Sequence, residues 1–145
     1  MAIRKLTVND IRKGQKDSLE VRIDADMVDR FAALSGDVSS LHMNDGFARD
    51  RGFDGRVVHG VLISAFVSQL LGVRFPGESC LLQSLNMKYL EPVYVNDHIR
   101  VVVECDQISA AVNSMTVSVQ VENSRTGSVK ARGKAQVGFL PEKRT

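Results

Sequence analysis

Residues 60–73 read GVLISAFVSQLLGV, a segment without a charged side chain and with apolar residues on every side of a helix. A helix that is apolar all round has to be buried. The segment is too short to cross a bilayer, which takes about 20 residues. It therefore predicts one long helix enclosed by the rest of a globular fold, and no membrane partner.

Small residues recur at intervals of four along this helix, at Gly60, Ser64, Ser68 and Gly72. Positions four apart lie on one face, so they form a slowly drifting stripe. The stripe has two interpretations that are compatible with each other. It can let the helix pack closely on a sheet, or it can form a groove in which a thin ligand lies along the helix.

The sequence after the helix alternates between apolar and polar residues, which predicts strands. These segments are 81–90, 99–106, 115–122 and 129–139, and an earlier one lies at 18–23. An antiparallel sheet with one apolar face and an apolar helix can bury each other if the sheet curls around the helix. The expected fold class is α+β.

Two shorter helices are predicted before the long one. Asp24 can cap a helix whose apolar residues, from Met27 to Leu34, end at Gly36. A short helix over residues 45–50 is then broken by the glycines at 52 and 55. These helices form an overhang that precedes the buried helix.

Composition places the chain among ordinary globular proteins. Its 145 residues fit one domain over 1–145, with 1–14 and 141–145 expected at the periphery. The net charge is only +2 and the basic residues are scattered, which argues against a nucleic-acid partner. Cys80 and Cys105 lack metal or disulfide spacing, and residues 1–14 lack the apolar core of a secretion signal. A cytoplasmic location is expected.

Asp37 and His42, with four residues between them, are the strongest indication of chemistry. Such a pair can also be a surface contact, but Val57-Val58-His59-Gly60 opens the apolar helix downstream and adds a second element. His59 can cap the helix, contact a substrate or fill the turn. A metal site from His42, His59 and Asp45 has no supporting spacing, so no metal is predicted.

The motifs at 35–42 and 58–60, together with Phe75-Pro76-Gly77 and the segment 91–97, resemble the MaoC-like family of (R)-specific enoyl-CoA hydratases. The resemblance runs from about residue 18 to residue 139. It implies the hot-dog fold, in which a curled antiparallel sheet wraps around one long helix. The chain departs from the family where Ser39-Ser40 replaces the usual Asn-Pro, and the Ser39 hydroxyl can then serve as a donor.

The resemblance also implies roles for individual residues. Asp37 and His42 match the catalytic pair that holds a water, and Gly60 matches the glycine whose N–H binds the thioester oxygen. Ser68 and Leu71 match positions that face the acyl chain. Ser39 and His59 complete the expected substrate-binding set.

The chemistry has physical reasons of its own. Water addition to a conjugated thioester places negative charge on the carbonyl oxygen, and a helix N-terminus offers free N–H donors there. An Asp carboxyl and a His imidazole that both contact one water can share the two proton transfers of the reaction. Which of the two is the base stays open at this point.

The implied activity is a hydro-lyase reaction, the reversible hydration of a trans-2-enoyl thioester to the (R)-3-hydroxyacyl thioester in fatty-acid or hydroxyalkanoate metabolism. The substrate is a coenzyme A ester, with an acyl carrier protein thioester left open, and no separate cofactor is needed. A homodimer or a dimer of dimers is expected because the sheet has open edges. The alternatives are a hot-dog thioesterase and a non-catalytic acyl-thioester binding module.

Overall fold

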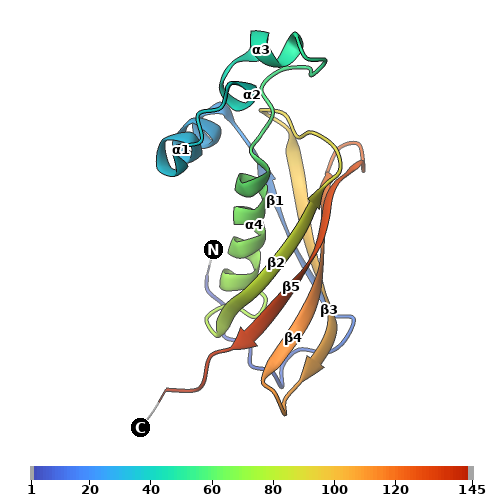
Figure 1. Ribbon diagram of the computed structural model, residues 1–145. Coiled ribbons are helices and arrows are strands. Elements are labelled where there is room, and N and C mark those ends of the chain that lie inside the picture. The colour runs from blue at the N-terminus through green and yellow to red at the C-terminus, as the bar shows by residue number, and fades with distance from the viewer. Residues whose placement is uncertain (1, 144–145) are drawn as a thin grey trace.

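The computed structural model describes residues 2–143 and contains one sheet with helices on one of its faces (Figure 1). The helices are α1 (Ala25–Ser35), α2 (Ser40–Met43), α3 (Asp45–Arg49) and α4 (Gly60–Val73). The strands are β1 (Lys16–Arg22), β2 (Cys80–Tyr89), β3 (His98–Ser109), β4 (Ser114–Asn123) and β5 (Val129–Phe139). The predicted α+β class is confirmed.

The sheet has the strand order β1-β3-β4-β5-β2, and neighbouring strands are antiparallel. Along β3 and β4 every second residue is buried, as the alternation in the sequence predicts. Val101 pairs with Val121 and Val103 with Val119, so valines line the face that α4 covers. The core forms between this face and the helix residues Leu70 and Leu71.

Helix α4 is buried on one side only, which corrects the expectation of a helix enclosed all round. Leu70 and Leu71 are fully buried, but Val61 is 66% exposed, and Ala65 and Ser68 are also exposed. The sheet of a single chain curves past only one side of the helix (Figure 1). Ser68 therefore does not mediate packing on the sheet, whereas the half-buried Ser64 contacts the end of strand β2, with its Oγ 2.6 Å from the Tyr89 hydroxyl.

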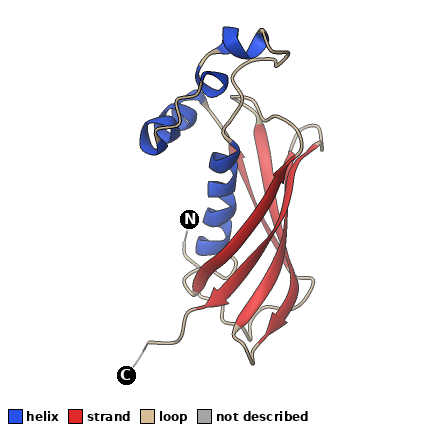
Figure 2. Cartoon of the chain, viewed as in Figure 1, coloured by secondary structure: helices blue, strands red, loops and turns tan. Residues whose placement is uncertain are grey.

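The three short helices gather beyond the N-terminal end of α4, as the predicted overhang (Figure 2). Helix α1 begins after Asp24, whose Oδ1 accepts a hydrogen bond from Met27 N at 2.9 Å. It ends at Gly36, which has φ 78°, a left-handed conformation that glycine adopts without strain. Helix α3 confirms the predicted short helix, whereas the four-residue α2 was not anticipated.

The N-terminal segment is not peripheral throughout, so that expectation was wrong in part. Ile11 is 3% exposed and belongs to the core. Arg4 N donates to Val73 O at 2.8 Å, and Leu6 N donates to Pro76 O at 3.1 Å. These bonds tie the segment to the chain that follows α4. At the other end residues 141–143 are exposed, and residues 144–145 of the expected tail lie outside the described range.

Both cysteines are free thiols; Cys105 is buried in the sheet and Cys80 is partly buried. Desolvation raises the pKa of both thiols. None of the helices within residues 2–143 combines the length and the hydropathy that crossing a membrane requires.

Candidate active site

Asp37 lies two residues beyond the end of α1, directly after the left-handed Gly36 that turns the chain. Its backbone N–H is bonded to Ser35 Oγ at 3.1 Å, and Ser35 Oγ in turn donates to Phe31 O at 2.8 Å. Its Oδ1 accepts from Ser39 Oγ at 2.8 Å and from Ser39 N at 3.2 Å. The Ser39 hydroxyl is the main reason that the pKa of Asp37 is lowered, followed by the Ser39 N–H. This carboxyl is held ionised.

His42 lies in α2 with its ring orientation fixed by the main chain. Its Nδ1 is 2.7 Å from Val57 O. A carbonyl oxygen can only accept, so Nδ1 carries the hydrogen and donates it. In the neutral ring the lone pair is therefore on Nε2. That atom is 3.9 Å from Asp37 Oδ2, too far for a direct hydrogen bond and suited to a water that contacts both groups.

His59 lies behind the pair and connects its two members. It is 2% exposed, and its Nε2 donates to the main-chain oxygen of Asp37 at 2.9 Å. Its ring stacks on that of His42 with centroids 3.9 Å apart, and Phe31 meets its edge at 4.9 Å. Among the described residues its Nδ1 is buried without a hydrogen-bond partner. A contact between His59 and substrate stays a prediction.

A cleft of about 290 Å³ opens beside His42 at the start of α4. Its walls come from the segment 57–63 and from the end of β2, and they are mostly apolar; the lining residues include Phe53, Val57, Gly60, Ile63, Leu90 and Pro92. No side chain caps the N-terminus of α4, so its first N–H groups are available to a ligand. The cleft therefore joins an imidazole to a helix N-terminus.

Gly60 has a structural reason to be glycine as well as a chemical one. A Cβ at this position would lie 3.0 Å from three ring atoms of Tyr89, so a side chain here would displace that ring. Tyr89 is the last residue of β2 and lines the same cleft. The sequence singled out Gly60 but not its neighbour Tyr89.

The other expected site residues are spread over different surroundings. Ser39 contacts Asp37 directly. Ser68 lies on the open side of α4, and Leu71 is fully buried in the core. Neither of them is among the residues that line the cleft in the described chain, so their contacts with an acyl group stay predictions.

Arg56 also supports the site and was missed in the sequence. Its Nε donates to His42 O at 2.6 Å, and its guanidinium pairs with Asp29 Oδ1 at 2.6 Å. Its main-chain N–H donates to Asp45 Oδ1 at 2.8 Å. It therefore fixes α2 against α1 and α3. The only signal was an arginine directly before the Val57-Val58-His59-Gly60 motif.

Asp37, His42 and His59 each offer one atom that could bind a metal, all within 4.8 Å of one another. The 3.9 Å between Asp37 Oδ2 and His42 Nε2 is wider than the ~3.4 Å expected between tetrahedral ligands that lie ~2.1 Å from an ion. Asp45 is not in this group, and its Oδ1 accepts a hydrogen bond from the main-chain N–H of Arg56. The spacing suits a water better than an ion.

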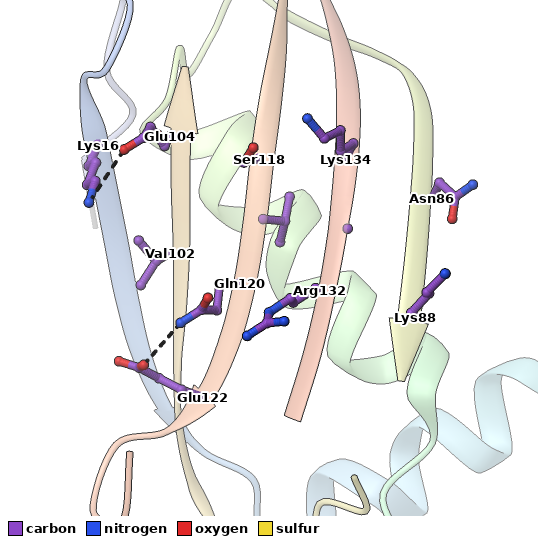
Figure 3. Close-up of a pocket in the computed structure, with 12 residues that line it drawn as sticks. Lys16, Asn86, Lys88, Val102, Glu104, Ser118, Gln120, Glu122, Arg132 and Lys134 are labelled. Carbon is purple, nitrogen blue, oxygen red and sulfur yellow. Dashed lines mark hydrogen bonds and ion pairs between the residues drawn. The ribbon is translucent and has the colours of Figure 1, made fainter. Parts of the chain in front are cut away.

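A larger hollow, about 800 Å³, lies on the face of the sheet away from α4 (Figure 3). Its walls are solvent-facing side chains such as Lys16, Glu104, Gln120 and Arg132, with Lys16 and Glu104 3.4 Å apart. Asp37, His42 and the N-terminus of α4 are not part of it. The cleft at α4 is therefore the candidate active site.

Known proteins match this chain over most of its length. The model of the MaoC like domain matches residues 7–128. The chain is 30% identical over 132 residues to an (R)-specific enoyl-CoA hydratase of Aeromonas caviae, covering 91% of this chain and 98% of that protein. An (R)-specific enoyl-CoA hydratase of Rhodospirillum rubrum is also 30% identical over 132 residues, with 86% and 92% covered.

Solved structures show the same fold. The (R)-hydratase from A. caviae superimposes with a TM-score of 0.84 at 31% identity, covering 90% of this chain and 98% of the other. An R-hydratase from Pseudomonas aeruginosa gives a TM-score of 0.89 at 24% identity, covering 97% and 89%. The predicted hot-dog fold is confirmed, and the chain belongs to the MaoC-like domain family.

Proposed function

We propose that this protein is an (R)-specific enoyl-CoA hydratase, which adds water reversibly to a trans-2-enoyl-CoA. The observation that carries the proposal is the 3.9 Å gap between Asp37 Oδ2 and His42 Nε2. His42 also lines the cleft that contains Gly60, whereas Asp37 lies beside His42 and is not among the lining residues. The names of the A. caviae and R. rubrum relatives support the substrate and the stereochemistry.

The N-terminus of α4 binds the thioester oxygen. As water attacks the β carbon, negative charge collects on this oxygen as an enolate. The Gly60 N–H and the positive end of the helix dipole stabilise that charge. The apolar walls of the cleft exclude bulk water and strengthen this interaction.

His42 and Asp37 move the protons. The water oxygen bonds to the β carbon while His42 Nε2 accepts one water proton, and the resulting imidazolium returns a proton to the α carbon. Hydroxyl and hydrogen are then both added, and His42 is restored. The support for His42 as the base is its Nδ1–H bond to Val57 O, which leaves Nε2 unprotonated. The ionised Asp37 orients the water and stabilises the imidazolium.

A second copy of the chain covers the open side of α4. Strand β2 is an edge strand, paired with β5 alone among the described strands, and Leu81 and Leu82 on it are exposed. Val61 is exposed on the adjacent helix side. Pairing of two β2 edges would extend the sheet and bury these residues together.

Light scattering tests this assembly. The protein should have the mass of a dimer or a dimer of dimers, and Val61→Glu should shift it towards the monomer. Val112→Glu is the matched control, since Val112 is 71% exposed in the turn between β3 and β4. A monomeric parent protein would contradict the proposal.

Incubation with crotonyl-CoA tests the reaction. Loss of the conjugated absorbance without free thiol, and a product of R configuration by chiral chromatography, supports the hydratase. Release of free coenzyme A without prior hydration would instead indicate a thioesterase. Saturable binding without either change would indicate a binding module. An S product would contradict the stereochemical part alone.

A further inference from the structure

Tyr89 is held against the first turns of α4 at two points. Its ring lies beside Gly60, where a Cβ would be 3.0 Å from three of the ring atoms. Its hydroxyl is 2.6 Å from Ser64 Oγ, one helical turn further along. The side chain is 47% exposed, so core packing does not impose this position. The hydroxyl bond to Ser64 is what anchors the ring.

The anchored ring stands across a path that an acyl chain could follow. Gly60 and Ser64 are four residues apart on α4, which is about 6 Å along the helix axis. A thioester whose oxygen binds Gly60 N–H, and whose chain runs along α4 towards Ser68, meets the Tyr89–Ser64 bond within that distance. Because the ring itself lies against Gly60, the space left for the acyl group is that of the cleft beside it.

The small volume of the cleft also indicates a short acyl group. Its volume of about 290 Å³ lies just below the ~300–1,000 Å³ typical of ligand sites. Its other walls are apolar and come from Phe53, Ile63, Leu90 and Val93. These walls suit a short hydrocarbon chain. Tyr89 forms a further wall, and one hydrogen bond, to Ser64, holds its ring in place.

We propose that Tyr89, anchored by Ser64, sets the chain-length specificity of this protein and restricts it to short acyl thioesters of about four carbons. The inference rests on the proposed function, because it takes Gly60 as the binding point of the thioester. Tyr89 and Ser64 are specificity-determining residues and take no part in proton transfer.

The test compares kcat/KM for crotonyl-CoA and trans-2-octenoyl-CoA. The parent protein should favour crotonyl-CoA by about tenfold or more. Tyr89→Ala should raise the octenoyl-to-crotonyl ratio by about tenfold or more. Tyr89→Phe and Ser64→Ala should each raise it less. The double variant with both of these changes should raise it no further, because both remove the same hydrogen bond.

Tyr94→Phe is the matched control, since Tyr94 OH bonds to Asp54 N at 3.2 Å and Tyr94 does not line the cleft. It should leave the ratio unchanged. Thermal unfolding checks that each variant is folded. If Tyr89→Ala does not fold, Tyr89→Phe and Ser64→Ala still test the proposal.

The inference is overturned if the parent protein uses both substrates equally, or if the folded Tyr89 variants keep the parent ratio. Absence of hydration with every enoyl-CoA would instead refute the proposed function. In that case, calorimetric measurement of the affinities for butyryl-CoA and octanoyl-CoA tests whether Tyr89 sets the chain-length preference. A preference for butyryl-CoA that Tyr89→Ala removes supports the inference, and equal affinities overturn it.

Discussion

The core of the sheet and the segment 36–59 are held in place by different forces. In the core, apolar side chains such as Val101, Val119 and Leu70 exclude water, and no polar contact is needed to position them. In the segment, His42 and His59 bond to main-chain oxygens, and Arg56 joins three elements. Stability therefore comes mainly from the first region, whereas the second fixes the geometry of the reacting groups.

The largest effect should come from breaking the site and leaving the core intact. Asp37→Asn and His42→Gln should each lower the rate of crotonyl-CoA hydration by about 10²–10⁴-fold, which is about 3–5 kcal/mol in the barrier. Steady-state kinetics measure this loss. The thermal unfolding midpoint should fall much less than in a core variant, and full activity in either variant would refute the proton-transfer scheme.

Disrupting the core should instead lower the stability and leave the activity of the folded protein unchanged. Leu70→Ala removes a fully buried side chain and should lower the free energy of unfolding by about 2–5 kcal/mol. The fraction that stays folded should keep its kcat. Urea denaturation measures the change, with the exposed Val112→Ala as a control that should cost under about 0.5 kcal/mol. Equal losses in the two variants would contradict the assignment of Leu70 to the core.

Arg56 should affect both properties because it links the two regions. Arg56→Ala leaves His42 O and Asp29 without their donor and should cost about 1.5–3 kcal/mol of stability. Activity should also fall, since α2 loses its support. Urea denaturation and kinetics are compared with Arg49→Ala, an exposed position of α3 that should change neither. A stable, fully active Arg56→Ala protein would exclude this role.

The smallest expected effect concerns the ionisation of Asp37. Ser39→Ala removes the donor that contributes most to the lowered pKa of Asp37, so this pKa should rise towards the ordinary value of about 3.9. Titration of the carboxyl carbon by ¹³C NMR follows the change. Ser40→Ala is the control, and an unchanged pKa in Ser39→Ala would show that the Ser39 hydroxyl does not bond to Asp37 in solution.

This lowered pKa also fixes a direction for stability. The pKa of Asp37 is lower in the folded chain than in the unfolded one, so the ionised carboxyl stabilises the fold above about pH 4. That contribution is lost as the pH falls through the lower, folded value. In Ser39→Ala the free energy of unfolding should therefore fall less than in the parent protein as the pH is lowered through this range.

The sequence predicted well those features that depend on neighbouring residues. Helix α1 begins after Asp24 and ends at Gly36, as the capping residue and the glycine indicate. The alternation in β3 and β4 appears as alternating burial. Asp37 and His42 come together because only a short turn and α2 separate them.

Features that depend on distant residues were missed. Tyr89 contacts Gly60 and Ser64 from another element, and Arg56 reaches Asp29 across 27 positions. Neither contact leaves a local pattern. The open side of α4 was missed for another reason: in sequence, an exposed apolar residue such as Val61 looks the same as one that faces the core.

The main-chain anchoring of His42 has a consequence for how this protein can change over generations. Val57 can be exchanged for another residue without loss of the carbonyl to which Nδ1 bonds. The side chain at position 57 can therefore change while the imidazole of His42 keeps its orientation.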